Sequence, residues 1–153
     1  MRTIKFRGKR SDTKEWVYGF YGLSLDDKHY IIEATFDHSG DRCYFFDTEV
    51  IPETVGQFTG LTDKNGKEIY EGDIVSFDGN MTADDTMGFE PNGFIYDENS
   101  IHCVVWGDEY ACWEVDFQND EHWKYKRDTR HLLITNSCKV IGNIHDNPEL
   151  LHE

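Results

Sequence analysis

Short runs in which apolar and polar side chains alternate dominate the sequence. Residues 3–7 alternate in this way, and after a short polar turn the aromatic residues Trp16, Tyr18 and Phe20 recur at every second position. A spacing of two places such residues on one face of a strand. We therefore predict a β-hairpin over residues 3–20, with the three aromatic side chains forming the apolar face of its second strand.

Further strands are predicted wherever apolar or alternating runs stand between turn residues. They cover residues 30–35, 43–46, 50–58, 69–70, 74–77, 101–106, 111–117, 131–135 and 138–144. The pair Asn65-Gly66 predicts a type I′ hairpin turn, because both central positions of that turn need a positive φ. Helix is indicated only at the C-terminus, where Asn147 can cap and Pro148 suits the first helical position.

About nine or ten short strands, separated by turn residues, indicate a mainly β protein of the sandwich or small-barrel type. Residues 78–93 form a long polar stretch between two of these strands. Loops of this length are uncommon in compact domains and are often functional or disordered. The sequence therefore predicts a compact sheet scaffold that carries one long acidic loop.

Charge is concentrated in one part of the chain. The 153 residues include 15 Lys and Arg against 30 Asp and Glu, for a formal net charge of −15, and residues 68–121 contain 15 acidic residues and no Lys or Arg. This stretch is either a solvated outer face that maintains solubility or a surface that docks on a basic partner. Its candidate interaction residues are Asp84, Asp85, Asp108, Glu109, Glu114 and Asp116.

The same charge disfavours nucleic acid as a partner, because affinity for its phosphates comes largely from Lys and Arg. Two basic segments nevertheless provide an alternative surface, namely the N-terminal strand and Lys124–Arg130. Small β-barrels bind oligonucleotides by stacking bases on aromatic side chains. A nucleic-acid module is therefore the alternative to a protein-binding module.

Cysteine and histidine spacing indicates no metal site. The four cysteines contain no C-x-x-C pair, so free thiols in a reducing cytosol are expected, with Cys43, Cys103 and Cys112 half-buried. His102, Cys103 and Cys112 could supply three zinc ligands, but the spacing fits no common zinc pattern. Neighbouring strand residues also point to opposite faces, which separates the first two.

Residues 78–89 resemble the start of a calcium-binding loop, with oxygen-bearing side chains at alternating positions. Ala83 stands where the sharp turn needs glycine, and Phe89 stands where glutamate would bind the ion. The sequence also lacks the G-x-S-x-G, P-loop and G-x-G-x-x-G motifs. We therefore expect a protein that is not an enzyme and has no catalytic residues, no metal and no cofactor. A hydrolase without a recognisable motif would be revealed by an apolar cleft with converging carboxylates or histidines.

Three segments resemble the YopX-like family of phage and prophage proteins. They are residues 4–7 (IKFR) followed by residues 15–19 (EWVYG), residues 57–75 (QFTGLTDKNGKEIYEGDIV) and residues 140–151 (VIGNIHDNPELL). The positions that match are Gly60, Leu61, Asp63, Asn65, Gly66, Ile69, Tyr70, Glu71, Gly72, Asp73, Val75, Ile141, Gly142 and Asn143. Turn geometry and packing account for most of them, whereas Tyr70, Glu71 and Asp73 are candidates for a polar contact site.

The resemblance implies an SH3-like β-barrel and no particular activity. The implied organisation is an N-terminal β segment over residues 1–56, the barrel over residues 57–146, and a short C-terminal helix or tail over residues 147–153, together one folding unit. It also implies a phage or prophage protein in the cytoplasm of a bacterial host, consistent with an N-terminus that lacks the apolar core of a signal peptide. We expect a host or phage protein as partner, no membrane association, and self-association as an open alternative.

Overall fold

The computed structural model describes residues 3–77, 100–108, 111–116 and 138–151. The chain divides into two compact units, Met1–Gly60 and Leu61–Glu153. Several predicted features lie outside the described residues: the loop 78–93, the strand 131–135, Asp84, Asp85, Glu109 and the basic segment Lys124–Arg130. The domain boundaries expected from the family resemblance remain a prediction.

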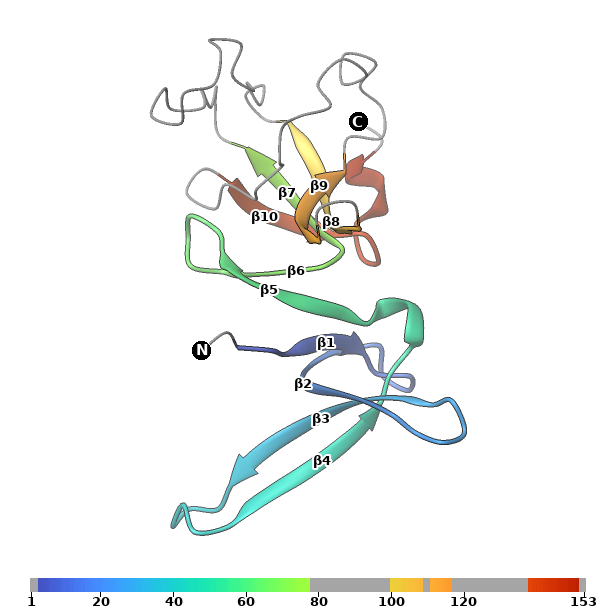
Figure 1. The fold of residues 1–153 in the computed structure, drawn as a ribbon, viewed down its shortest axis with the longest axis vertical. Helices are drawn as coiled ribbons and strands as arrows, with labels where there is room; N and C mark the ends of the chain where they lie inside the picture. The colour runs from blue at the N-terminus through green and yellow to red at the C-terminus, as the bar shows by residue number, and fades with distance from the viewer. Residues whose placement is uncertain (1–2, 78–99, 109–110, 117–137, 152–153) are drawn as a thin grey trace. The chain divides into compact units, whose positions relative to one another are not determined.

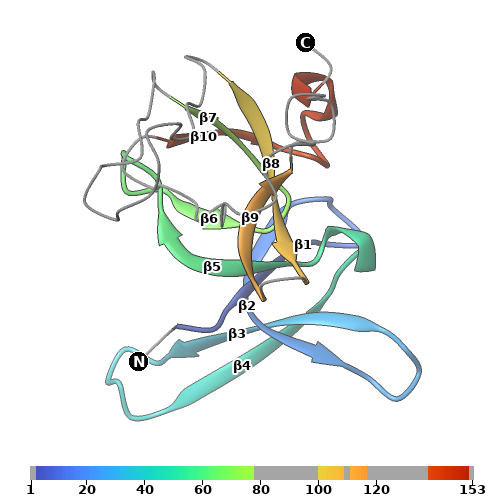
Figure 2. The same cartoon turned by 45° about the horizontal axis from the view of Figure 1, so that its top comes forward.

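The first unit is built on an antiparallel sheet with the strand order β4-β3-β2-β1-β5 (Figures 1 and 2). Its elements are β1 (Phe6–Lys9), β2 (Trp16–Leu23), β3 (His29–Phe36), β4 (Cys43–Glu49), the 3-10 turn η1 (Pro52–Thr54) and most of β5 (Gly56–Thr62), whose last two residues belong to the second unit. β1 pairs with β2 in the register Arg7↔Tyr18. The predicted hairpin is therefore confirmed, although its first strand begins at Phe6.

The buried face of β2 is not the one predicted. Val17 packs with Ile31 and Val50 in the core of this unit, whereas Tyr18 and Phe20 are 48% and 56% exposed. On the inner face, a Cβ added at Gly19 would collide with the carbonyl oxygen of Ile32. Only glycine therefore fits at position 19, and Tyr18 and Phe20 on the other face are directed to solvent.

Residues 50–58 were predicted to be extended, but a 3-10 turn interrupts them at Pro52–Thr54. The hydroxyl of Thr54 stabilises this turn because it donates to the carbonyl of Ile51 (2.7 Å) and accepts the N–H of Lys9 (2.8 Å). The side chain of Thr54 thereby connects the turn to β1.

The second unit contains a sheet with the order β10-β7-β8-β9, preceded by β6, which is hydrogen-bonded to the end of β5. Its elements are β6 (Glu68–Tyr70), β7 (Asp73–Phe77), β8 (Ile101–Gly107), β9 (Cys112–Asp116), β10 (Cys138–Asn143) and the 3-10 turn η4 (Pro148–Leu151). The pairs β10–β7, β7–β8 and β8–β9 in this sheet are antiparallel. In β9, Trp113 and Val115 are buried, as the alternating pattern predicted.

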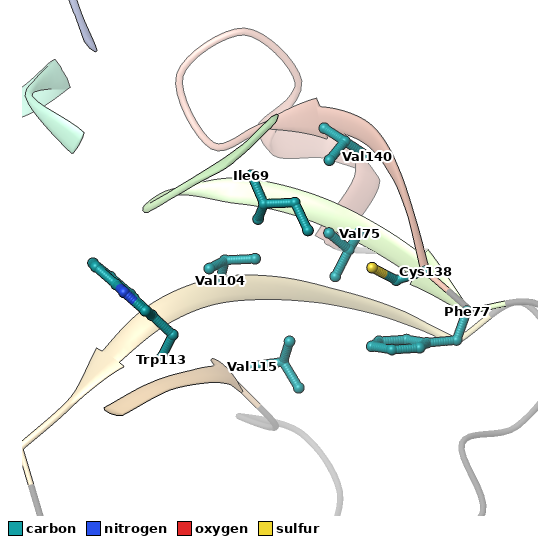
Figure 3. Close-up of a cluster of buried hydrophobic side chains, with 8 residues drawn as sticks. All are labelled: Ile69, Val75, Phe77, Val104, Trp113, Val115, Cys138 and Val140. Carbon is teal, nitrogen blue, oxygen red and sulfur yellow. The ribbon is translucent and has the colours of Figure 1, made fainter. Parts of the chain in front are cut away.

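The core of the second unit lies between these strands. Figure 3 shows its side chains directed toward one another: Ile69, Val75, Phe77, Val104, Trp113, Val115, Cys138 and Val140. The ring of Phe77 contacts that of His102 edge to face, with centroids 5.9 Å apart. β-branched and aromatic residues dominate the cluster, as expected for short strands that share one buried face.

The chain is mainly β, with two antiparallel sheets that do not close into a barrel within the described residues. At the C-terminus, Pro148–Leu151 forms a single 3-10 turn in place of a regular helix. In the described ranges, no helix has the length and apolar character needed to cross a bilayer.

Candidate functional site

The turn between β5 and β6 is organised by the carboxylate of Asp63. Its Oδ1 accepts the N–H groups of Asn65 (2.8 Å) and Lys67 (2.9 Å). Its Oδ2 accepts the N–H of Val140 (3.0 Å), in β10. Asp63, which is 5% exposed, therefore joins two signature segments that are 77 residues apart.

Burial and these hydrogen bonds set the pKa values of Asp63 and of the neighbouring Cys138. Burial disfavours the charged form of Asp63, but the N–H donors of Val140, Lys67 and Asn65 outweigh it and hold the pKa below its usual value. Burial, with the nearby charge of Asp63, raises the pKa of the Cys138 thiol to about 11. Asp63 is therefore an anion and Cys138 a neutral thiol at neutral pH.

The predicted type I′ turn at Asn65-Gly66 is wrong. Gly66 has a φ of 81°, but Asn65 is not among the residues with a positive φ. The N–H of Gly66 donates to the carbonyl of Asp63 (2.9 Å), and the N–H of Asp63 donates to the carbonyl of Lys67 (2.7 Å). The side chain of Asp63 thus stabilises a longer turn in which only the glycine needs the left-handed region.

The bend Glu71-Gly72-Asp73 connects three strands. Oδ2 of the buried Asp73 accepts the N–H of Tyr70 (2.8 Å), so the carboxylate caps the bend. The N–H of Gly72 donates to the carbonyl of Val104 (2.8 Å), and the carbonyl of Gly72 accepts the N–H of Ile144 (2.9 Å). The Tyr70 hydroxyl donates to the carboxylate of Glu68 (2.9 Å).

The C-terminal signature segment folds back on itself. Oδ1 of Asn143 accepts the N–H groups of His145 and Asp146, both at 3.0 Å, and its amide donates to the carboxylate of Asp146 (2.8 Å). The β10–β7 register shifts between Val140 and Gly142. A Cβ at Gly142 would lie 2.7 Å from Oδ1 of Asn147. The β10–β7 pairing therefore has a bulge next to Gly142, and the side chain of Asn147 leaves no room for a Cβ at this position.

The structure places the signature residues along neighbouring elements. Gly60 and Leu61 lie in β5, Asp63, Asn65 and Gly66 in the turn, Ile69 and Tyr70 in β6, Glu71 and Gly72 in the bend, Asp73 and Val75 in β7, and Ile141, Gly142 and Asn143 in β10. Among these signature residues, Asp63 and Asp73 accept backbone N–H groups at their carboxylates. The hydrogen bonds of these signature residues therefore connect the turns to the neighbouring strands.

The candidate acidic face is described at three positions. Glu114 and Asp116 alternate with the buried residues of β9, and both are half-buried, while Asp108 is exposed directly after β8. In the ladder, Glu114 lies opposite Val105 and Asp116 opposite Cys103. A Cβ at Gly107 would collide with the carboxylate of Glu114, so this glycine leaves room for the acidic side chain.

The described residues hold no group of three or more His, Cys, Asp or Glu side chains placed to bind a metal ion. The ring of His102 contacts Phe77, and its Nδ1 lies 3.4 Å from the carbonyl oxygen of Asp116. The four cysteines are free thiols.

Comparison with known proteins supports the family resemblance of these signature segments. The model of the YopX protein family matches residues 5–152. The chain belongs to the YopX family. The crystal structure of protein EF1440 from Enterococcus faecalis is similar over 99% of both chains, with a TM-score of 0.53 and 24% sequence identity, and this likeness shows the fold. No curated protein matches the sequence.

The YopX signature did not reveal the exposed aromatic residues of the β3–β4 hairpin. Phe36, Tyr44, Phe45 and Phe46 are between 45% and 65% exposed. A signal was present in the sequence, because three consecutive aromatic residues cannot all lie on one face of a strand. Cys43, which was expected to be half-buried, is exposed at the start of this run.

Replacing Gly72 with alanine is expected to lower the free energy of unfolding by about 1–2 kcal/mol, since its φ of 78° is costly for any residue with a Cβ. The added Cβ itself would lie 3.4 Å from Ile144, in ordinary contact. Urea denaturation checks this value, with Gly66→Ala as the matched control at a φ of 81° in open space. An unchanged stability for Gly72→Ala would show that the bend relaxes without strain.

Proposed function

We propose that this YopX-family chain is a phage or prophage accessory protein that is not an enzyme and binds a protein partner in the bacterial cytoplasm. The observation that carries the proposal is the acidic, non-core face of β9. Glu114 and Asp116 share this face, Asp108 is exposed nearby in the sequence, and residues 68–121 contain no Lys or Arg. A negatively charged surface favours a basic partner and accelerates its association.

The fold of the second unit, in this proposal, is that of an SH3-like barrel with a short helical C-terminal end. Two contacts support the barrel. Asp63 accepts the N–H of Val140, and the N–H of Lys64 donates to the carbonyl of Cys138 (3.1 Å). Both contacts bring β10 beside the turn that joins β5 to β6, which is the kind of approach that barrel closure requires.

Reversing the charge of the acidic face is expected to weaken partner binding at least about tenfold, because opposite charges across an interface would become like charges. The variant carries Asp108→Lys, Glu114→Lys and Asp116→Lys. Its control carries Asp26→Lys, Asp41→Lys and Glu53→Lys, three exposed positions in the first unit, so both variants change net charge equally. Affinity capture from host lysate, followed by titration of the captured protein, measures the effect.

The proposal requires that the control variant binds like the unmodified chain and that raising the salt concentration weakens binding. Equal capture by the acidic-face variant and the unmodified chain would contradict a role for this face. Circular dichroism of both variants establishes that the comparison is made between folded proteins.

The alternative is a nucleic-acid module that uses the basic N-terminal strand. Lys5 lies over the ring of Phe58, and Arg7 and Lys9 lie over that of Trp16, beside the exposed aromatic face of β2. Arg7 is only 6% exposed, and Lys5 and Lys9 are half-buried, so phosphate contacts from this strand would come from these two lysines. Binding of a single-stranded oligonucleotide at low salt, lost steeply as salt rises, would favour this alternative.

A further inference from the structure

β4 forms one edge of the sheet in the first unit. It pairs with β3 through seven consecutive positions, from Tyr30↔Glu49 to Phe36↔Cys43, without a register shift. In the described part of the chain, no strand lies on its other side. The long β3–β4 ribbon and its outer strand can be followed in Figures 1 and 2.

The hydrogen-bond pattern identifies which residues of β4 face outward. The N–H of Asp37 donates to the carbonyl of Arg42 (3.0 Å), and the N–H of Val50 donates to that of His29 (2.9 Å). These bonds mark the two ends of one ladder, in which hydrogen-bonded pairs alternate. The even-numbered residues of β4 therefore bond to β3, and the odd-numbered residues direct their N–H and C=O groups away from it.

The open part of this edge is short and well defined. Of the odd-numbered residues, Glu49 already accepts the N–H of Ser11 at its carbonyl (3.0 Å). Cys43, Phe45 and Asp47 remain, and the structure describes no strand that pairs with them on the outer side. Natural edge strands are usually protected by Lys, Pro or a bulge. Residues 43–48 contain no Lys or Pro, Asp47 is their single charged residue, and the ladder contains no bulge.

Side chains at this edge are apolar on both faces. Tyr44 and Phe46 lie on one face and are 45% and 57% exposed, and Phe45 lies on the other and is 65% exposed. Exposed apolar surface concentrated at one place is typical of an interaction site. An unprotected strand edge with exposed aromatic residues is suited to pairing with another strand.

We propose that β4 pairs antiparallel with β4 of a second copy of this chain, about a twofold axis at Phe45. In this register Phe45 faces Phe45 of the second copy, and Cys43 faces its Asp47. Every outward N–H and C=O group of Cys43, Phe45 and Asp47 then has a partner. On the opposite face Tyr44 meets Phe46 of the second copy, which forms an aromatic cross-strand pair.

The edge is complementary to itself in this register and not in the neighbouring one. If the axis were at Phe46, Cys43 would face Glu49, whose carbonyl is already bonded to Ser11. Phe45 would then face the charged Asp47. An axis at Tyr44 would instead place Asp47 opposite Asp41, with two like charges facing each other. Only the axis at Phe45 pairs the three open positions with one another, and the interface that results is isologous and closed.

The expected dimer is weak. Aromatic side chains bury about 150–250 Å² each, so three half-exposed rings per copy contribute roughly 600 Å² in total, about half of the ~1,200 Å² of a stable interface. The net charge of −15 on each copy also opposes association. A dissociation constant on the order of 10 µM is expected, and dimerisation should strengthen as salt screens the repulsion.

Analytical ultracentrifugation of the full chain tests the proposal. The unmodified protein should show a monomer–dimer equilibrium that shifts at least about fivefold toward the dimer between about 50 and 500 mM salt. Phe45→Lys, which adds the protection that natural edges carry, should weaken association at least about tenfold. Phe20→Lys is the matched control, because Phe20 is similarly exposed (56%) but lies on β2, away from the edge.

A disulfide experiment tests the register itself. In a Cys43→Ser background, Phe45→Cys would place two cysteines directly opposite each other, at a Cα separation of about 5.5 Å that suits a disulfide. Phe46→Cys would face Tyr44 of the second copy instead. Mild oxidation should therefore cross-link the Phe45→Cys variant at least about tenfold faster than the Phe46→Cys variant.

Several results would overturn the proposal, which does not depend on the proposed function. A monomer at all salt concentrations up to about 200 µM protein would do so. Faster cross-linking of Phe46→Cys, or equal loss of dimer in Phe20→Lys, would show a different interface. A monomer that binds an oligonucleotide or an unrelated peptide through Phe45 would assign the edge to that partner.

Discussion

Replacing Asp63 with alanine is expected to lower the free energy of unfolding by about 3–5 kcal/mol. The carboxylate accepts the N–H groups of Asn65, Lys67 and Val140. Hydrogen bonds to a charged group are worth about 1.5–3 kcal/mol each. The N–H of Val140 is buried and would lose its acceptor at a further cost of about 1–3 kcal/mol, whereas the bonds from Asn65 and Lys67 are only partly buried. Urea denaturation at neutral pH measures the loss, and Asp26→Ala, at an exposed position, is the control.

The effect of Asp63 depends on pH in a defined direction. Its pKa is lowered in the folded protein because the three N–H donors outweigh the effect of burial. A lowered pKa contributes stability above the unfolded value of about 3.9, and this contribution is lost as the pH falls through the folded pKa. The stability difference between the unmodified chain and Asp63→Ala should therefore be largest near neutrality and decrease in acid. A constant difference from neutral pH to strong acid would show that the carboxylate charge plays no part.

Replacing Phe77 with alanine is expected to destabilise the second unit by about 3–5 kcal/mol, the range for removing a large buried aromatic side chain. Phe77 has no exposed surface, packs in the core shown in Figure 3, and contacts the ring of His102. Far-UV circular dichroism during urea denaturation provides the measurement.

Two further variants serve as controls for Phe77→Ala. Phe77→Leu retains most of the volume and should cost less than about half as much. Phe20→Ala removes an exposed phenylalanine and should stay within about 0.5 kcal/mol of the unmodified chain. If Phe77→Ala were as stable as Phe20→Ala, Phe77 would not belong to the packed core.

Alternation predicted the strands better than it predicted their buried faces. In β9 the apolar residues Trp113 and Val115 are the buried ones, as expected. In β2 the aromatic face is exposed, because the core side is crowded around Gly19 and admits only small side chains there. Alternation distinguishes two faces of a strand, whereas the close approach of another strand decides which face can be buried.

Local turn rules failed at Asp63 for a related reason. Asn65-Gly66 is a strong local signal for a type I′ turn. The side chain of Asp63 accepts two N–H groups within the turn and one from Val140, 77 residues later, and this combination favours a different turn. The residues around Asp63 in the sequence provide the first two of these bonds. The third bond, from the N–H of Val140, forms only when β10 has packed beside the turn. The signature residues were therefore found from the sequence, while the bonds they make were not.

The order of the strands has a consequence for folding during synthesis. All strands that surround the core of the first unit come from one continuous stretch, so its sheet can form while the ribosome is still producing the remainder. In the second unit β7 pairs with β10, in a register that begins with Cys138 opposite Phe77. Its core therefore stays incomplete until the ribosome has produced residues 138–143, and such distant pairing slows folding. A nascent chain stalled before Cys138 would carry a folded N-terminal unit and an unfinished C-terminal one.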